Sequence, residues 1–115
     1  RTILLKIEAD PKFVGPLQSV STAEFGIEGH SQQEFAYHCA QLIEAGFLTG
    51  NVKMADRGLV AVGKLTWNGH EFLDAVRDPD VWTKTKDRTK GLASVGLQFL
   101  WEIAKAEIKV KLGLP

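Results

Sequence analysis

The chain has 115 residues, of which 44% are hydrophobic and 24% are charged, so it is long enough to bury a core without disulfides or structural metals. Its single cysteine, Cys39, excludes a disulfide framework and a cysteine-based zinc site. A lone cysteine is typical of a reducing compartment, and we expect a cytoplasmic protein. No apolar run is as long as a membrane span, and the first residues do not resemble a signal peptide. Because the chain begins at Arg1 within a predicted helix, we expect that further residues precede it.

The formal net charge of zero conceals an uneven distribution. Residues 1–80 contain seven Lys/Arg and eleven Asp/Glu, whereas residues 81–115 contain seven Lys/Arg and three Asp/Glu. Phosphate contacts dominate the affinity of proteins for nucleic acid, and nucleic-acid binders usually carry a basic patch. The neutral total therefore argues mildly against strong non-specific DNA binding, and the cationic part of the chain is its C-terminal third.

The first thirty residues predict a helix followed by a short strand. Ile3, Leu4 and Ile7 form a helical stripe that ends before Pro11, because proline disfavours helix in the residue before it. Residues 20–28 then alternate between apolar and polar side chains, with Phe25 on the apolar side. Alternation of period two is typical of a strand.

A second helix is predicted to begin at Gln32. Ser31 and Glu34 have the S-x-x-E spacing of a capping box, and Gly46 stands where a left-handed residue ends a helix. The apolar residues at helical spacing predict one buried face: Phe35, Cys39, Leu42 and Ile43. The remaining face is predicted to be free: Gln32, Gln33, Ala36, Tyr37 and Ala40.

Residues 47–66 predict a β-hairpin with Lys53 and Arg57 near its tip and an Asp-Arg-Gly turn. Thr66 is then a suitable N-cap for a helix that ends before Pro79. The predicted core includes Ile7, Phe25, Phe35, Leu42, Phe47, Leu65, Trp67 and Leu73.

The C-terminal third predicts a cationic segment and a long helix from Leu92 to Leu112. The cations recur at every second residue: Lys84, Lys86, Arg88 and Lys90. This spacing spreads charge around a helix, which is typical of a solvated linker, and contact with phosphates is the alternative.

The long helix carries an apolar seam at intervals of four, three and four residues: Phe99, Ile103, Ala106 and Val110. The short first helix covers only part of such a seam. We therefore expect a homodimer built on it, because two-fold dimers are the commonest oligomers. Packing of the seam within one chain is the alternative.

The order helix, strand, helix, hairpin, helices outlines an α+β winged-helix domain with a small antiparallel sheet and an additional C-terminal helix. The stretch FAYHCAQLIEAGFL is similar to the recognition helix of many bacterial winged-helix regulators. LTWNGHEFLDAV resembles the step by which such domains leave the second strand of the wing. We expect a winged-helix core over residues 1–80 and a helical extension over 81–115.

A closer resemblance covers nearly the whole chain. ILLKIEADP, IEGHSQQEFAYHCAQLIEAGF, LTWNGHEFLDAVRDPDVWTKTK and the lysine-rich C-terminal helix together resemble an uncharacterised bacterial and phage-associated winged-helix family known only as a domain of unknown function. Cys39 departs from the leucine-like residue usual there, which affects packing alone, since a buried thiol behaves as a small hydrophobe. The resemblance implies a fold and no activity or site residues.

Enzyme and metal chemistry are poorly indicated. His30, His38 and His70 fall in different elements without zinc-ligand spacing, so we expect no metal and expect His38 to pack at the edge of the core. Cys39 lies on the apolar face, away from the accessible, electropositive surroundings that a nucleophile needs. A Gly-rich phosphate loop is absent as well. The sequence therefore predicts neither an enzyme nor a cofactor.

Two functions remain open. Glutamine can pair with adenine, alanine can pack on the thymine methyl, and tyrosine can reach a phosphate or a base edge. A regulator of transcription that binds duplex DNA would use the following candidates: Gln32, Gln33, Ala36, Tyr37, Lys53, Arg57, Lys84, Lys86 and Arg88. The free helix face carries no Lys or Arg, and the alternative is a winged-helix module that binds another protein and not DNA.

Overall fold

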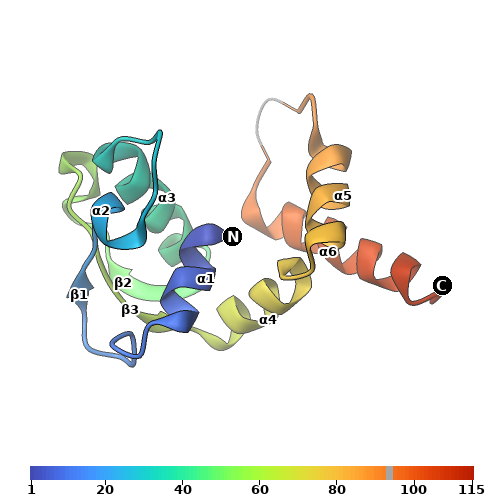
Figure 1. The fold of residues 1–115 in the computed structure, drawn as a ribbon, viewed down its shortest axis with the longest axis horizontal. Helices are drawn as coiled ribbons and strands as arrows, with labels where there is room; N and C mark the ends of the chain where they lie inside the picture. The colour runs from blue at the N-terminus through green and yellow to red at the C-terminus, as the bar shows by residue number, and fades with distance from the viewer. Residues whose placement is uncertain (93–94) are drawn as a thin grey trace. The chain divides into compact units, whose positions relative to one another are not determined.

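The structure is a computed structural model that describes residues 1–92 and 95–115. Along the chain it has α1 (Thr2–Ala9), β1 (Gln18–Ser19), α2 (Thr22–Phe25), α3 (Gln32–Glu44), β2 (Leu48–Asn51), the 3₁₀ turn η1 (Ala55–Arg57), β3 (Ala61–Leu65), α4 (Trp67–Val76), α5 (Pro79–Thr89) and α6 (Leu97–Lys111) (Figure 1). It divides into an N-terminal unit, Thr2–His70, and a C-terminal unit, Glu71–Pro115 with Arg1. The fold class is α+β. Whether residues 1–80 and 81–115 behave as separate parts stays a prediction.

A three-stranded antiparallel sheet with the order β1-β3-β2 organises the N-terminal unit. In the central strand, Ala61 pairs with Ser19 of β1 and with Asn51 of β2. The hairpin predicted over residues 47–66 is confirmed, with β2 and β3 as its arms and η1 in the connection. Gly58 ends η1 with a φ of 78°, a left-handed conformation that favours glycine.

Three phenylalanines connect the elements around this sheet. Phe25 packs edge-to-face on Phe13 and on Phe35, with ring centroids 6.1 Å and 5.3 Å apart, a geometry that aromatic pairs prefer. The core of the unit also includes Leu4, Ile7, Val20, Cys39, Leu42, Phe47, Leu48, Val60, Val62 and Leu65.

Both predicted ends of α3 are confirmed. The Ser31 hydroxyl accepts a hydrogen bond from the backbone N–H of Glu34, whose carboxylate reaches back to the N–H of Ser31, so the capping box is complete. At the other end Gly46 has a φ of 84° and donates to the carbonyl of Ile43. Phe47 donates to the carbonyl of Leu42, which completes a Schellman motif.

The strand predicted over residues 20–28 is wrong. β1 ends at Ser19, and Thr22–Phe25 forms the short helix α2. The Ser21 hydroxyl accepts a hydrogen bond from the N–H of Glu24, and Gly26, with a φ of 63°, ends the helix. Ser21 and Glu24 have the same S-x-x-E spacing that begins α3. This cap outweighs the alternation of apolar residues, and Phe25 is buried from a helix instead of a strand.

The predicted core is confirmed except at Trp67, whose side chain is 78% exposed. Thr66 caps α4, because its hydroxyl accepts from the N–H of Gly69 and donates to the carbonyl of Gly46. Trp67 is therefore the first residue of the helix. The buried Val76 lies about 180° around the helix from it, at about 100° per residue, which leaves Trp67 on the outer side.

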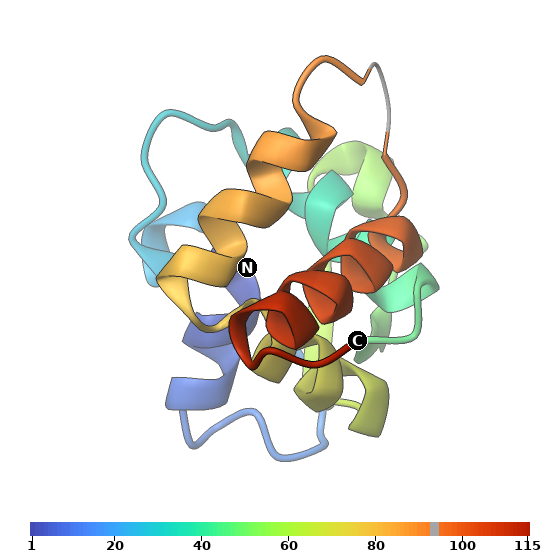
Figure 2. The ribbon, with the colours of Figure 1, turned by 90° about the vertical axis from the view of Figure 1, so that its right-hand side faces the viewer.

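In the C-terminal unit, α5 and α6 lie side by side (Figure 2). Asp78 caps α5 by accepting hydrogen bonds from the N–H groups of Asp80 and Val81, and Pro79 occupies the first turn. The long helix predicted from Leu92 is shorter, since α6 begins at Leu97 after its N-cap Gly96. Residues 93 and 94 of that prediction lie outside the described residues. Within the described ranges, no helix combines the length and apolar content needed to cross a membrane.

Gly69 is a position where one added methyl group should destabilise the fold. A Cβ there would lie 2.0 Å from the carbonyl oxygen of Phe47 and 2.9 Å from its carbonyl carbon. Backbone must move to relieve this clash, so we expect Gly69→Ala to lower the free energy of unfolding by about 2–3 kcal/mol, despite the higher helix propensity of alanine.

Urea unfolding followed by circular dichroism measures this difference. Gly96→Ala is the control, because a Cβ at Gly96 has nothing within 4 Å and glycine and alanine differ by less than about 1 kcal/mol at an N-cap. Equal stabilities of the two variants would contradict the close contact between α4 and Phe47.

Candidate nucleic-acid interface

The outward side of α3 carries a polar row at intervals of about one helical turn: Gln33, Tyr37, Gln41 and Glu44. Tyr37 is 60% exposed, and Gln41 donates a hydrogen bond from Nε2 to its hydroxyl over 3.3 Å. A hollow of about 370 Å³ separates this row from the hairpin connection, where Val52, Ala55 and Asp56 form its other wall. The polar row of α3 and the connection therefore line opposite walls of one hollow.

Ala36 does not belong to this surface, contrary to the sequence prediction. It is 0% exposed, and Ala40 is buried as well. The buried side of α3 is wider than its apolar stripe because both β2 and η1 pack against the helix, and small residues allow such approach. Ala36 therefore cannot contact a thymine methyl group.

Gln32 is also engaged within the protein. Its Oε1 accepts a hydrogen bond from the N–H of Thr22 over 2.9 Å. Its Nε2 donates to the carbonyl of Gly58 over 2.9 Å and to that of Val20 over 3.3 Å. The amide thus joins the start of α2, the end of β1 and the hairpin connection, and it has no donor left for a base edge.

Lys53 and Arg57 lie in the hairpin connection, as predicted, and both are exposed. Among the residues that the structure describes, neither takes part in an ion pair. Neither cation lines the hollow beside α3, whose charged lining residues are Glu44 and Asp56, and Lys53 instead lines a second hollow together with Met54 and Leu59. The hollow beside α3 is therefore acidic, and the nearest cations in the sequence belong to the connection.

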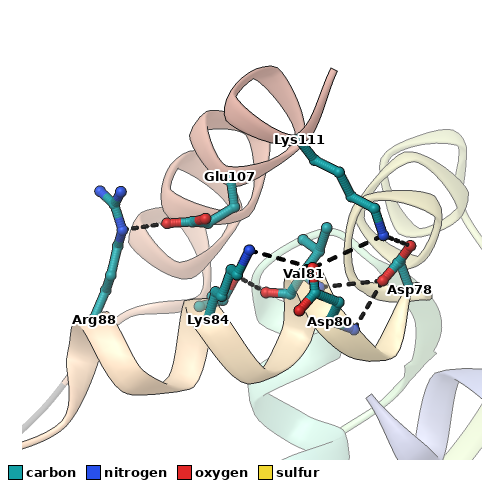
Figure 3. A network of polar contacts seen from close by, with 8 residues as sticks. Asp78, Asp80, Val81, Lys84, Arg88, Glu107 and Lys111 are labelled. Atoms are coloured by element: carbon teal, nitrogen blue, oxygen red, sulfur yellow. Dashed lines mark hydrogen bonds and ion pairs between the residues drawn. The ribbon is translucent and has the colours of Figure 1, made fainter. Parts of the chain in front are cut away.

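Two cations of α5, Lys84 and Arg88, pair with carboxylates of the C-terminal unit (Figure 3). Lys84 Nζ lies 3.3 Å from a carboxylate oxygen of Asp80, and Arg88 pairs with Glu107 of α6. The ammonium of Lys86 lies 5.6 Å from the centroid of the Trp82 ring, within the range of a cation–π contact. Ion pairing therefore reduces the charge that Lys84 and Arg88 can offer to a phosphate.

A second contact in Figure 3 fixes the opposite end of the α5–α6 pair. Lys111 Nζ lies 2.6 Å from a carboxylate oxygen of Asp78. This hydrogen bond, helped by the N–H of Val81, lowers the pKa of Asp78 below its usual value, and the same bond raises the pKa of Lys111. A lowered carboxyl pKa contributes stability above the unfolded pKa and loses it as the pH falls.

The residues weighed for catalysis or metal binding do not gather. His38 is exposed beside the Tyr37 ring, not at the edge of the core as expected, and His30 Nδ1 lies 3.0 Å from a Glu34 oxygen. Burial raises the pKa of the Cys39 thiol to about 12, so it stays protonated at neutral pH. Nowhere in residues 1–92 and 95–115 do three or more metal-ligating side chains cluster.

The seam predicted on α6 lies largely uncovered. Phe99 and Val110 are 52% and 61% exposed, Ala106 is exposed, and Ile103 is half-buried. The residues of α6 that are buried are Ala104 and Glu107, on another side of the helix. The seam is therefore not the face by which α6 packs on α5.

Three of the residues that line this hollow were not identified from the sequence: Gln41, Glu44 and Asp56. Gln41 was detectable, because it continues the four-residue spacing of Gln33 and Tyr37. The two carboxylates were not, since their proximity depends on how the connection folds against α3.

The chain is therefore an α+β protein with a small antiparallel sheet. Its helix α3 has an exposed polar face that lies beside the β2–β3 connection. Residues 1–96 match the family described as hypothetical protein (DUF2513), and the chain belongs to this family. A protein of Haemophilus influenzae, described as an uncharacterized protein, is 31% identical over 112 residues that cover 94% of this chain and 89% of that protein. No solved structure matches the chain.

The neighbours Gln32 and Gln33 should differ sharply on replacement. Gln32→Ala leaves three partly buried backbone groups without their partner, and we expect a loss of about 2–3 kcal/mol in the free energy of unfolding. Gln33→Ala removes an exposed side chain and should change it by less than about 0.5 kcal/mol. Thermal or urea unfolding tests both variants, and similar values for the two would argue against the internal role of Gln32.

The pair of Arg88 and Glu107 is suited to a double-mutant cycle. The Glu107 side chain is 5% exposed and that of Arg88 is 56% exposed, so Arg88→Ala leaves a buried carboxylate unpaired. We expect a loss of about 1–2 kcal/mol, reduced by the exposure of the arginine. In a Glu107→Gln background the same change should cost less than about 0.5 kcal/mol. Equal costs in both backgrounds, measured by urea unfolding, would show that the pair is not coupled.

Proposed function

We propose that the protein is a winged-helix protein that binds duplex DNA through α3 and the β2–β3 connection. The order α1-β1-α2-α3-β2-β3 and the antiparallel sheet β1-β3-β2 favour this fold, in which the second helix of the helix-turn-helix enters the major groove. One observation carries the proposal: the exposed Gln33 and Tyr37 lie on a helix that packs against η1, and the connection around η1 carries Lys53 and Arg57, which form no ion pair within the described residues. Such binding would suit a regulator of transcription.

In this proposal each residue has a distinct task. The Gln33 amide pairs with an adenine edge in the major groove, and the Tyr37 hydroxyl contacts a phosphate while Gln41 holds its orientation. Lys53 and Arg57 contact the phosphates that flank the groove. Gln32 and Ala36 have no contact with DNA, because both are engaged within the protein.

The charge distribution limits how many phosphates the surface can neutralise. Residues 2–70 contain five Lys/Arg and seven Asp/Glu, and Glu44 and Asp56 line the hollow beside the connection. With two cations in contact, the logarithm of the binding constant should fall with the logarithm of the salt concentration with a slope of about −1.8. The proposal therefore predicts modest affinity and shallow salt dependence.

Replacing Lys53 and Arg57 together by alanine should weaken binding to all sequences and remove most of this slope. Gln33→Ala should instead relax the sequence preference and leave the slope unchanged. Fluorescence anisotropy with duplexes selected from a random pool, at several salt concentrations, measures both effects.

Lys64→Ala is the control for charge, because Lys64 is an exposed cation of the same unit at the opposite end of β3 from the connection. We expect it to change the slope little. A slope that the double variant leaves unchanged would remove the connection from the mechanism, and absence of binding at low salt would refute the proposed function.

A protein partner is the second candidate function. Met54 and Leu59 are exposed beside a hollow of about 560 Å³ that is lined by Val20, Val60 and Ala61. Exposed apolar groups around a concave surface are typical of sites for other proteins. This alternative predicts that Leu59→Ser abolishes the interaction, whereas Gln33→Ala does not.

A further inference from the structure

Helix α6 has apolar side chains on two sides. On the inner side Ala104 is fully buried, and Trp101 packs edge-to-face on Phe72 of α4 with ring centroids 6.2 Å apart. The second side is the outer stripe, which consists of Phe99, Ile103, Ala106 and Val110. A surface helix ordinarily has one apolar face, which packs on the core of its own chain. The outer stripe is a second apolar face that α6 does not use for packing on α5.

We propose that a second copy of the chain covers the outer stripe, with the two α6 helices packed antiparallel about a two-fold axis. The intervals of four, three and four residues are those of the a and d positions of a coiled coil. An antiparallel pair places Phe99 against Val110 of the partner subunit, and Ile103 against Ala106 of the partner subunit. Each layer then combines a larger with a smaller side chain, as a closely packed interface requires.

Charges beside the stripe select this orientation. Glu102 and Lys109 lie on the same flank of the outer stripe, each one residue before an apolar position. In the antiparallel pair Glu102 lies beside Lys109 of the partner subunit, and the two-fold axis forms this contact twice. A parallel pair would instead place Glu102 near the position of Glu107 of the partner subunit, which is buried and already paired with Arg88, so the charges on this flank would gain no partner.

Lys109 is available for such a contact. Within residues 1–92 and 95–115 it takes part in no ion pair, whereas Glu102 pairs with Lys105 one turn away over 2.9 Å. A second copy therefore supplies an acidic partner for Lys109. The inference rests on α6 alone and is independent of what α3 binds.

Light scattering and sedimentation velocity test the apolar contact. The unmodified chain should dimerise in the micromolar range, and Ile103→Glu should raise the dissociation constant at least about 100-fold, as expected for a residue at the centre of an interface. Circular dichroism checks that this variant remains folded. A chain that stays monomeric at high micromolar concentration, or a dimer that Ile103→Glu leaves intact, would overturn the proposal.

Charge reversal tests the orientation without touching the apolar stripe. Glu102→Lys and Lys109→Glu should each raise the dissociation constant about ten-fold, because each reverses two contacts. The double variant should return to within about three-fold of the unmodified chain.

Lys105→Ala is the matched control, because it adds no carboxylate four residues before Lys109. It disturbs the same ion pair within α6 but lies off the stripe, so the dissociation constant should not change. Two single reversals without effect, or a double variant as weak as the single ones, would overturn the antiparallel dimer.

Discussion

One side-chain amide, that of Gln32, joins three segments of the N-terminal unit. Its three hydrogen bonds satisfy backbone groups of Val20, Thr22 and Gly58, and unpaired polar groups of this kind are costly to leave within a fold. The same amide therefore holds the start of α3 against the start of α2 and against the hairpin connection. The adjacent Gln33 points outward on a helix whose position relative to the connection is already set. Gln32, which was placed among the DNA-binding candidates from the sequence, thus has an internal role and positions the helix on which Gln33 is exposed.

Local hydrogen-bonding patterns made most of the fold predictable. The capping box at Ser31, the left-handed Gly46 and the cap at Thr66 each depend on a few consecutive residues, so the sequence alone reveals them. The predictions were wrong where two local patterns competed, or where the side of the helix on which a residue falls determines whether it is buried. At Ser21 a cap and a period-two alternation overlap, and the cap prevails. Trp67 is the first residue of its helix and falls on the outer side, although its size suggests the core.

The candidate site was less predictable than the fold, because accessibility is set by elements distant in the sequence. Ala36 has the spacing of an exposed residue and becomes buried where β2 and η1 meet α3. The charge of Arg88 looks free in the sequence, yet its partner Glu107 is on another helix. Gln33 and Tyr37, by contrast, remain exposed. Helical periodicity identifies the side opposite an apolar stripe, but it does not reveal what approaches the margins of that stripe.

The burial of Cys39 gives the chain a built-in reporter of transient opening. A thiol that is fully enclosed and has a pKa of about 12 meets an alkylating reagent only during the brief intervals when α3 separates from its core. The rate constant of alkylation then equals the equilibrium constant for opening multiplied by the rate constant for a free thiol. Because the chain holds no other cysteine, each modified molecule records an opening at this one helix. Any molecule that binds the closed form lowers the rate of Cys39 alkylation in proportion to the fraction of chains that it occupies, whatever its chemical nature.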